Sequence, residues 1–289
     1  MAIKYRVALR NVQNVAASKT AIIECPIGKR YHHIILQHGY ASGTNTIAAA
    51  YTNISEVRVL VNNRVQRVAS GTQLRDKNLL NGTTFDALVG GVPNTAPGVS
   101  IPIYFAEPWL TDELSQDALA WPTNLFERFH VEVDLSTAST PTLLAFAVVD
   151  NLQADKMPNI SKWIRSSQAA ASTSFDISSI DKRDFLRVIS VYPDSGGTNQ
   201  PSRLTFRKDG EILHELTYTS NATLLQSYSM APAASGRTSN VYDLVFDHDG
   251  LLGSAVPMAG ARDATLTVEA ASTMSGTTTF IVERLGPPE

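Results

Sequence analysis

Short runs of alternating apolar and polar residues recur along the chain, and two of them turn back on themselves in the same way. One run, residues 54–67, alternates valines with charged residues before and after Asn62-Asn63. The other, residues 201–213, alternates in the same manner around Asp209-Gly210. A period of two marks a β-strand with one buried face, and Asn, Asp or Gly at a two-residue turn tolerates the positive φ that joins antiparallel strands. Both runs predict β-hairpins.

The two hairpins share one spacing. Leu204 lies 204 − 57 = 147 residues after Val57, and Asp209 follows Asn62 by the same number. Their flanks repeat in the same order, with one strand before each hairpin, a pair of leucines after it, and then three further strands. The matched segments are 31–36 with 185–190, 79–80 with 224–225, 101–105 with 241–246, 131–135 with 266–270, and 144–148 with 280–282.

This repeat predicts two tandem copies of one β-domain of ordinary size. With about eight strands in each copy, the favoured fold class is all-β, with two tandem jelly-roll β-sandwiches, a double jelly roll, and short flanking helices. The expected boundaries are 1–151 for the first jelly roll with an N-terminal arm, 152–173 for a linker and 174–289 for the second jelly roll.

One helix and four long loops complete the expected outline. Thr111 is the expected N-cap of a helix that has Asp112 and Glu113 in its first turn and ends before Pro122. The loops are long and nearly uncharged, which is typical of surface variation or binding. They span residues 41–53, 86–98, 193–200 and 231–240.

Composition excludes several classes of protein. Of the 289 residues 18% are charged and the net charge is −3, so no global basic field predicts a sequence-specific nucleic-acid binder. A single cysteine, Cys25, cannot form an internal disulfide. No apolar run approaches the ~20 residues of a membrane span, and no signal-peptide pattern opens the sequence. We expect a protein that is made inside a cell.

Four cations precede the first acidic residue. Lys4, Arg6, Arg10 and Lys19 all lie before Glu24. Two interpretations stay open. The residues belong to a solvated edge strand with its charges on the open face, or they form a membrane- or interior-facing basic arm, in which each Lys or Arg adds about 1 kcal/mol of attraction to an anionic surface.

One motif in the second copy has the composition of a metal site. Asp247 and Asp249 are oxygen ligands spaced by two and followed by Gly250, as in a Ca²⁺ loop, but the rest of an EF-hand sequence is missing. An ordinary acidic turn is the favoured interpretation, with a structural Ca²⁺ as the alternative and no other cofactor expected. No nucleophile, P-loop or zinc-protease pattern occurs, so we do not expect an enzyme.

Three short motifs near the start, Asn14-Val15-Ala16-Ala17, Pro26-Ile27-Gly28 and Tyr31, precede the first hairpin. Together with the order of elements through both domains, they resemble the major capsid proteins of corticoviruses, icosahedral bacteriophages with an internal membrane, and of related prophages. The resemblance covers nearly the whole chain. The loops at 41–53 and 86–98 are longer than in that family.

The resemblance implies a viral major capsid (coat) protein. It implies homotrimers that contribute two barrels per subunit, tile as pseudo-hexamers and contact neighbouring trimers. The loops of each barrel would face outward at one end and the internal viral membrane would lie at the other, with minor capsid or membrane proteins as further partners. The protein would be made in a bacterial cytoplasm and reside in the virion, and the family has no catalytic residues.

The alternative is a carbohydrate-binding, lectin-like double β-sandwich, such as a phage receptor-binding protein or a surface adhesin. That function requires aromatic side chains on an exposed face, whereas Trp109, Trp121 and Trp163 are expected at a helix start, a helix end and the linker. A jelly-roll hydrolase ranks third.

Overall fold

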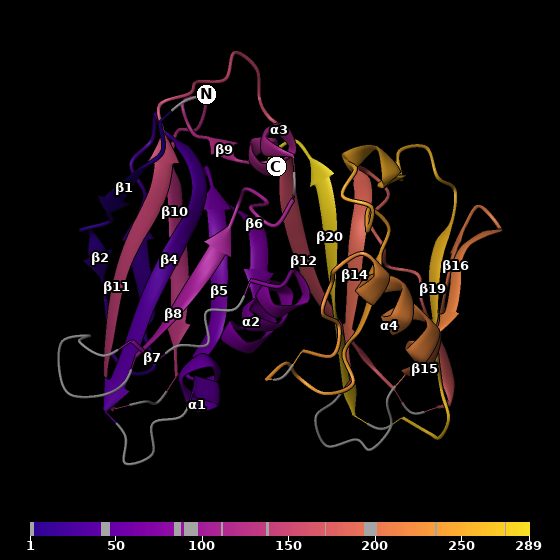
Figure 1. The fold of residues 1–289 in the computed structure, drawn as a ribbon. Helices are drawn as coiled ribbons and strands as arrows, with labels where there is room; N and C mark the ends of the chain where they lie inside the picture. Colours follow the sequence, from indigo (N-terminus) through magenta and orange to yellow (C-terminus); the bar gives the residue numbers. More distant parts are fainter. Residues whose placement is uncertain are drawn as a thin grey trace. The chain divides into compact units, whose positions relative to one another are not determined.

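The chain forms two compact units, each built from two β-sheets that pack face to face. The computed structural model describes residues 3–41, 47–83, 88–89, 98–110, 112–136, 139–170, 172–193, 201–234, 236–274 and 276–289. The first unit comprises Met1–Lys162 with Pro287–Glu289, and the second comprises Trp163–Gly286. Figure 1 shows both, coloured along the sequence.

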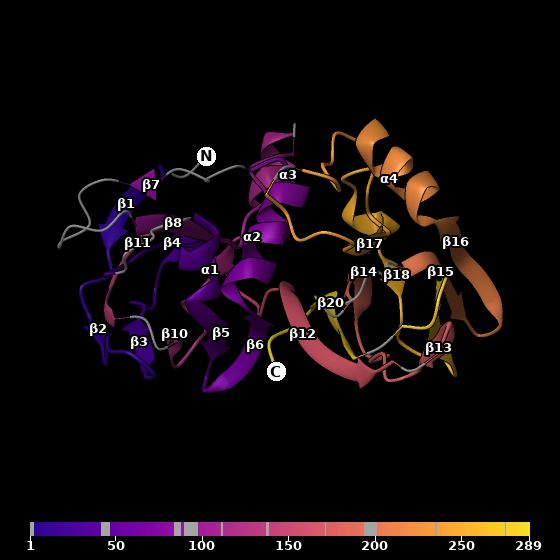
Figure 2. The ribbon, with the colours of Figure 1, turned by 90° about the horizontal axis from the view of Figure 1, so that it is seen from below.

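The two sheets of the first unit form separate layers, which are seen edge-on in Figure 2. One sheet has the order β1-β11-β4-β8-β7, with β9 beside β4, and the other has the order β6-β5-β10-β3-β2. The strands are β1 (Tyr5–Ala8), β2 (Val12–Gln13), β3 (Thr20–Glu24), β4 (Arg30–Ala41), β5 (Ile54–Val61), β6 (Arg64–Ala69), β7 (Leu88–Val89), β8 (Gly98–Tyr104), β9 (Trp121–Pro122), β10 (Phe129–Leu135) and β11 (Ser139–Asp150).

The second unit repeats this arrangement. One sheet runs β12-β20-β14-β17, with β18 beside β14, and the other runs β13-β19-β15-β16. Strand for strand, this is the order of the first unit, so the predicted duplication and the double jelly roll are confirmed. The strands are β12 (Ile160–Ala169), β13 (Ser174–Ile177), β14 (Phe185–Tyr192), β15 (Pro201–Lys208), β16 (Glu211–Thr217), β17 (Tyr242–Val245), β18 (Val256–Pro257), β19 (Ala264–Ala270) and β20 (Thr277–Gly286).

Strand pairing supports the repeat at the level of single residues. Val59 pairs with Val131 in the first unit. Phe206, the counterpart of Val59 in the 147-residue spacing, pairs with Leu266 in the second. All four side chains are buried, so the apolar positions of the alternating runs do face the two cores.

Two of the predicted segment matches are displaced by one residue. Ala147 faces the core opposite Ile34, and Val282 does so opposite Ile189, whereas Phe146 points outward. The pairings of β4 with β11 and of β14 with β20 skip one residue at equivalent places, His32 and Arg187, so the displacement lies in the sequence alignment and not in the strand register.

Both predicted hairpins are present and turn where expected. Asn62 and Asn63 have φ of 51° and 64°, and Asp209 and Gly210 have φ of 51° and 84°. We call the end of each unit that carries this turn the hairpin end. The opposite end, where the connections from β4 to β5 and from β6 to β8 leave the first unit, is the long-loop end; in the second unit these are the connections from β14 to β15 and from β16 to β17.

The expected helix is shorter than predicted. It is α3 (Glu113–Asp117), with Asp112 as its N-cap, and Thr111 lies outside the described residues. Trp121 belongs instead to β9, because its backbone pairs with Tyr31 of β4. The apolar periodicity predicted a helix as far as Trp121, but the chain leaves the helix after Asp117 and Trp121 pairs with β4 instead.

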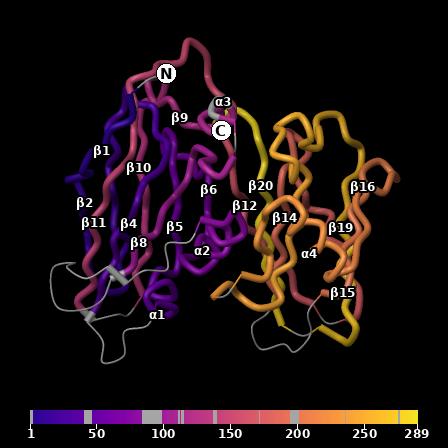
Figure 3. Tube along the Cα trace, in the orientation of Figure 1, coloured from indigo at the N-terminus to yellow at the C-terminus, as the bar shows by residue number. Residues whose placement is uncertain are grey.

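The paired leucines lie in two longer helices. These are α2 (Gly71–Leu80), capped by Ser70 in a capping box with Gln73, and α4 (Tyr218–Ser227), capped by Thr217. Figure 3 traces the path from β16 into α4. The Ser-x-x-Gln pattern before the first leucine pair was a usable helix-start signal that the sequence analysis missed.

Residues 160–169 of the predicted linker form strand β12, the first strand of the second jelly roll. Its Ser- and Ala-rich second half looked like a linker by composition. In the structure its backbone lies beside β20, so sheet formation outweighs weak strand propensity.

Parts of the predicted loops lie outside the described residues, namely 42–46, 86–87, 90–97, 194–200 and 235. The first of these loops contains the short helix α1 (Ile47–Thr52). Among the described residues, no helix is long and apolar enough to cross a membrane.

Candidate functional site

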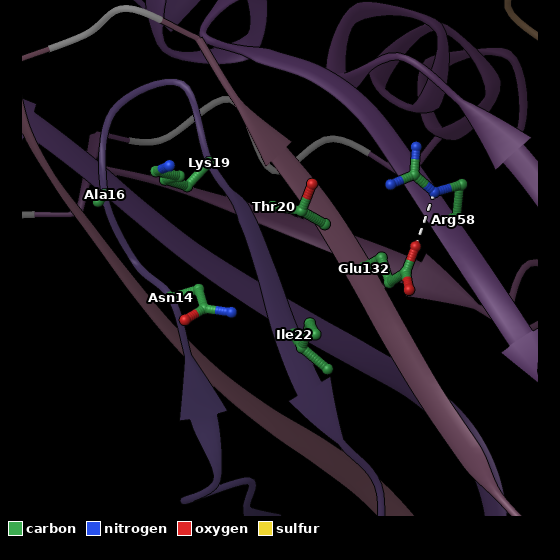
Figure 4. Close-up of a pocket in the computed structure, with 7 residues that line it drawn as sticks. All are labelled: Asn14, Ala16, Lys19, Thr20, Ile22, Arg58 and Glu132. Carbon is green, nitrogen blue, oxygen red and sulfur yellow. Dashed lines mark hydrogen bonds and ion pairs between the residues drawn. The ribbon is translucent and has the colours of Figure 1, made fainter.

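A shallow groove of about 620 Å³ lies on the outer side of the β3-β10-β5 layer in the first unit. Figure 4 shows its lining, with Arg58 and Glu132 bonded across two neighbouring strands. The lining residues are Asn14, Ala16, Lys19, Thr20, Ile22, Arg58 and Glu132.

An ion-pair network centred on Arg58 forms one side of this groove. The Arg58 guanidinium lies 2.8 Å from Glu132, 2.8 Å from Asp134 and 2.5 Å from Glu56. Thr20 also donates a hydrogen bond to Asp134, at 2.6 Å. Burial alone would raise the pKa of Asp134, but the hydrogen bonds from Arg58 and Thr20 outweigh it and lower that pKa. The charges are thus engaged in holding three strands together.

This network lacks the features of a catalytic centre. The groove lining contains no cysteine or histidine, and its one carboxylate, Glu132, is paired with Arg58. A general base needs a free carboxylate or imidazole within reach of its substrate. We therefore interpret the groove as the charged outer surface of a sheet.

The outer side of the other sheet in the first unit has the opposite character. We call it the apolar face. Its side chains point away from the core on β1, β11, β4 and β8, in cross-strand rows. One row is Ala8, Phe146, Ile35 and Pro102, and the next is Arg6, Val148, His33 and Tyr104. Beside them Leu144 is 45% exposed.

The equivalent face of the second unit is polar and buried. Its row is Ile281, Ser190 and Asp243, all at most 1% exposed. Ser190 donates a hydrogen bond of 2.6 Å to Asp243, and Arg237 forms an ion pair with the same carboxylate. Asn221 of α4 donates to the Asp243 main-chain carbonyl at 2.7 Å. The first unit has the same helix contact, since Asn78 of α2 donates to the Pro102 main-chain carbonyl at 3.0 Å, but it has no counterpart of the buried Arg237–Asp243 ion pair among the described residues of that row.

A usable sequence signal marked the apolar face. Residues 143–149 read Leu-Leu-Ala-Phe-Ala-Val-Val, so both faces of β11 are apolar. A strand that is apolar on both faces is typically buried on both. This run therefore indicates a cover on the outer side of β11, which the sequence-based outline above does not include.

The four predicted cations do not form one basic arm. Lys4 lies at the hairpin end, where its ammonium is 2.7 Å from Asp117. Lys19 lies at the long-loop end, because Leu135 donates its main-chain N–H to the Lys19 carbonyl. Arg6 and Arg10 are exposed on and just after β1. A surface that meets only one end of the sandwich therefore cannot contact both Lys4 and Lys19.

The two predicted calcium ligands have other partners. Asp247 is buried and accepts a 2.5 Å hydrogen bond from Arg187, and burial raises its pKa. Asp249 accepts hydrogen bonds from Ser254 and from the Leu251 main chain. Among the described residues no group of three or more His, Cys, Asp or Glu is arranged to hold a metal ion. A bound Ca²⁺ stays an untested expectation.

The three tryptophans do not form an exposed binding platform. Trp121 is fully buried and Trp163 is 8% exposed. Trp109 packs edge-on against Tyr104, with 5.5 Å between ring centroids. This placement does not favour the lectin-like alternative.

Comparison with protein families identifies both halves of the chain. Residues 6–150 match the viral coat protein P2 N-terminal domain, and residues 160–288 match the viral coat protein P2 C-terminal domain. No curated protein matches the chain by sequence.

Three solved structures of capsid proteins illustrate the similarity in fold. The chain is similar to the major capsid protein P2 from bacteriophage PM2, at 20% identity over 99% of this chain and 98% of that chain, with a TM-score of 0.79. It is also similar to the STIV MCP, at 12% identity over 98% and 96%, with a TM-score of 0.70. The Faustovirus major capsid protein is 8% identical over 99% and 90%, with a TM-score of 0.66. Since the two family models span nearly the whole chain, the protein belongs to the viral coat protein P2 family and is a viral major capsid protein, a component of the virion.

Proposed function

We propose that this coat protein assembles as a homotrimer before it enters a shell, and that the apolar face of the first unit is the contact. The observation that carries the proposal is a strip of this face on β11, where Leu144 is 45% exposed and Phe146 and Val148 are partly exposed, whereas Ile35 and Tyr104 are only 9% exposed. A contiguous exposed apolar patch on a sheet is typical of a protein interface.

The interface would join unlike surfaces of neighbouring copies. The equivalent face of the second unit is polar, so the two units of one copy present different surfaces to neighbouring copies. A contact between unlike surfaces must close into a ring or continue as a filament. Three subunits with two similar barrels each close such a ring with near-sixfold spacing and tile as a pseudo-hexamer.

Size-exclusion chromatography with light scattering tests this assembly. At micromolar concentration and neutral pH we expect about three times the 31.3 kDa of one chain. An obligate interface of this kind buries upward of about 2,000 Å². A mass of one chain under these conditions would refute the trimer.

We further propose that the hairpin end faces the interior of the shell, toward a lipid membrane. Several of the large exposed apolar side chains of the first unit gather in three neighbouring segments at this end. Gln153 bonds to Gly28, and Asn124 bonds to Ala154, which fastens the segments together. The side chains are Ile27 at 49%, Leu125 at 37%, Leu152 at 50% and Met157 at 45% exposure.

This cluster has the composition of a membrane-surface contact. The same segments contain two cations, Lys29 and Lys156, and two anions, Asp155 and Glu127. Their net charge therefore adds little to the attraction to a membrane, and the apolar side chains would supply it. Apolar side chains bordered by lysines are typical of surfaces that bind at the lipid headgroup boundary.

Flotation with vesicles of zwitterionic and of anionic lipid tests this orientation. We expect the wild type to float with both, and a Leu152→Asp/Met157→Asp variant to lose at least half of its binding. The matched control is Thr52→Asp/Ser55→Asp, which adds two charges at exposed positions of the long-loop end and outside the proposed subunit contact. Equal flotation of all three proteins would contradict a lipid contact at the hairpin end.

A further inference from the structure

Two edge strands of the chain carry opposite charge. In the first unit β1 is the last strand of its sheet, and in the second unit β16 is the last strand of its sheet. Arg6 and Arg10 are exposed on or beside β1, which contains no acid. Glu211 and Glu215 are exposed on β16, which contains no Lys or Arg.

The open side of β16 is unusually apolar for an edge. Ile212 is 47% exposed and Leu213 is 38% exposed. An exposed edge strand with unpaired main-chain groups is a template for another strand, and proteins usually protect such edges. Here the two glutamates provide the protection against unspecific pairing, and they also select a basic partner.

We propose that β16 of one copy adds to the edge of β1 in a neighbouring copy, so that one sheet continues across the subunit contact. Strand addition places the new strand about 4.8 Å from the edge strand, joined to it by main-chain hydrogen bonds, and the side chains decide which strand is accepted. The proposal rests on the trimer proposed above and adds to it a second contact, at the edge of the sheet whose outer side is the apolar face.

The charged side chains that would meet in the β1–β16 contact are accessible to a partner. Lys4 is engaged with Asp117, and Glu215 lies 3.2 Å from Arg203, with both side chains more than 40% exposed. No ion pair joins Arg6, Arg10 or Glu211 to another described residue, and these three residues are left to attract the partner strand. The N-terminal cations then serve the contact between subunits instead of a membrane.

Charge reversal on each strand, alone and combined, tests the pairing by light scattering across a dilution series of the full chain. Arg6→Glu/Arg10→Glu and Glu211→Lys/Glu215→Lys should each weaken association about tenfold or more, because like charges would meet. The variant with all four changes should associate within about threefold of the wild type, because the attraction is restored with its signs exchanged. Arg64→Glu and Glu127→Lys, single reversals at exposed positions elsewhere, are the controls and should associate as the wild type does.

The outcomes separate the two proposals. A wild-type chain that is monomeric overturns both. An assembled wild type with both reversed variants equally assembled overturns the β1–β16 pairing and leaves the trimer standing. If each reversal disrupts assembly but the combination does not restore it, the strands act on different partners and the pairing is wrong. Hydrogen exchange gives a second measurement, since the main-chain amides of β16 should exchange at least tenfold more slowly in the assembled wild type than in the Arg6→Glu/Arg10→Glu variant.

Discussion

The outer faces of two equivalent sheets differ, although their strand order is the same. In the first unit the row Phe146, Ile35 and Pro102 is apolar and lies beside the exposed Leu144. In the second unit the corresponding row includes Ser190 and Asp243, which are buried and bonded to each other. The inner faces of both sheets stay apolar.

This difference shows which part of a duplicated fold is free to change. An inner position must fill a close-packed core, where a lost methylene or an added charge destabilises the unit. An outer position is constrained only by what covers it. One copy can therefore acquire its own polar cover and the other an interface, and a ring of unlike contacts requires such an asymmetry.

The largest expected difference is between substitutions at two neighbouring leucines of β11, one on the inner face of the sheet and one on the outer face. Leu143 is 4% exposed and faces the core, whereas Leu144 is 45% exposed. We expect Leu143→Asp to prevent folding of the first unit, because an unpaired charge would be buried. Leu144→Asp should fold with a monomer stability within about 0.5 kcal/mol of the wild type, but elute as one chain. Circular dichroism measures whether each variant folds, and light scattering measures its mass in solution. Loss of folding in both variants would contradict the assignment of faces.

The polar cover of the second unit is expected to be the next most sensitive feature. Asp243→Ala leaves the Arg237 side chain, 1% exposed, without its carboxylate. Removing one partner of a buried ion pair costs about 3 kcal/mol or more. Ser190→Ala removes a single hydrogen bond to the same carboxylate and should cost only about 1 kcal/mol. Urea denaturation measures both, and equal costs for the two variants would show that Arg237 is stabilised by other groups.

The smallest expected effect is a loss of stability in mild acid. Burial lowers the pKa of His33 in the first unit to about 4, with the nearby His32 adding to the effect. Burial, with His248 adding to it, lowers the pKa of His214 in the second to about 4. The unfolded chain takes up a proton near its ordinary pKa of about 6.5, while the folded chain does not until about 4. Folding stability should therefore be constant above pH 6.5 and fall as the pH drops from 6.5 toward 4.

Thermal unfolding at pH 7 and pH 5 tests this expectation. The wild type should lose about 2 °C or more between the two values, and His33→Gln and His214→Gln should each lose less. Because the two histidines lie in different units, the variants show which unit limits stability in acid. If all three proteins lose the same amount, other groups cause the acid sensitivity.

Local features of the sequence determined the hairpins, the core positions and the duplication. Asn62-Asn63 and Asp209-Gly210 turn because their residue types accept positive φ, and Val59 and Phe206 face the cores because a strand alternates its side chains. The turn conformation and the alternation of side chains each depend on only a few neighbouring residues, so both can be predicted from the sequence.

Only the tertiary structure decided the remaining features, because each depends on partners that are distant in the chain. Both faces of β11 are apolar, and its pairing with β4 selects Ala147 as the inner residue and Phe146 as the outer one. The Ser- and Ala-rich β12 is a strand because β20 lies beside it. Lys4 and Lys19 are close in sequence but lie at opposite ends of the first unit, since the intervening strands β1, β2 and β3 carry the chain along the sandwich. Sheet formation pairs residues more than a hundred positions apart, and a local sequence pattern does not predict which strands will pair.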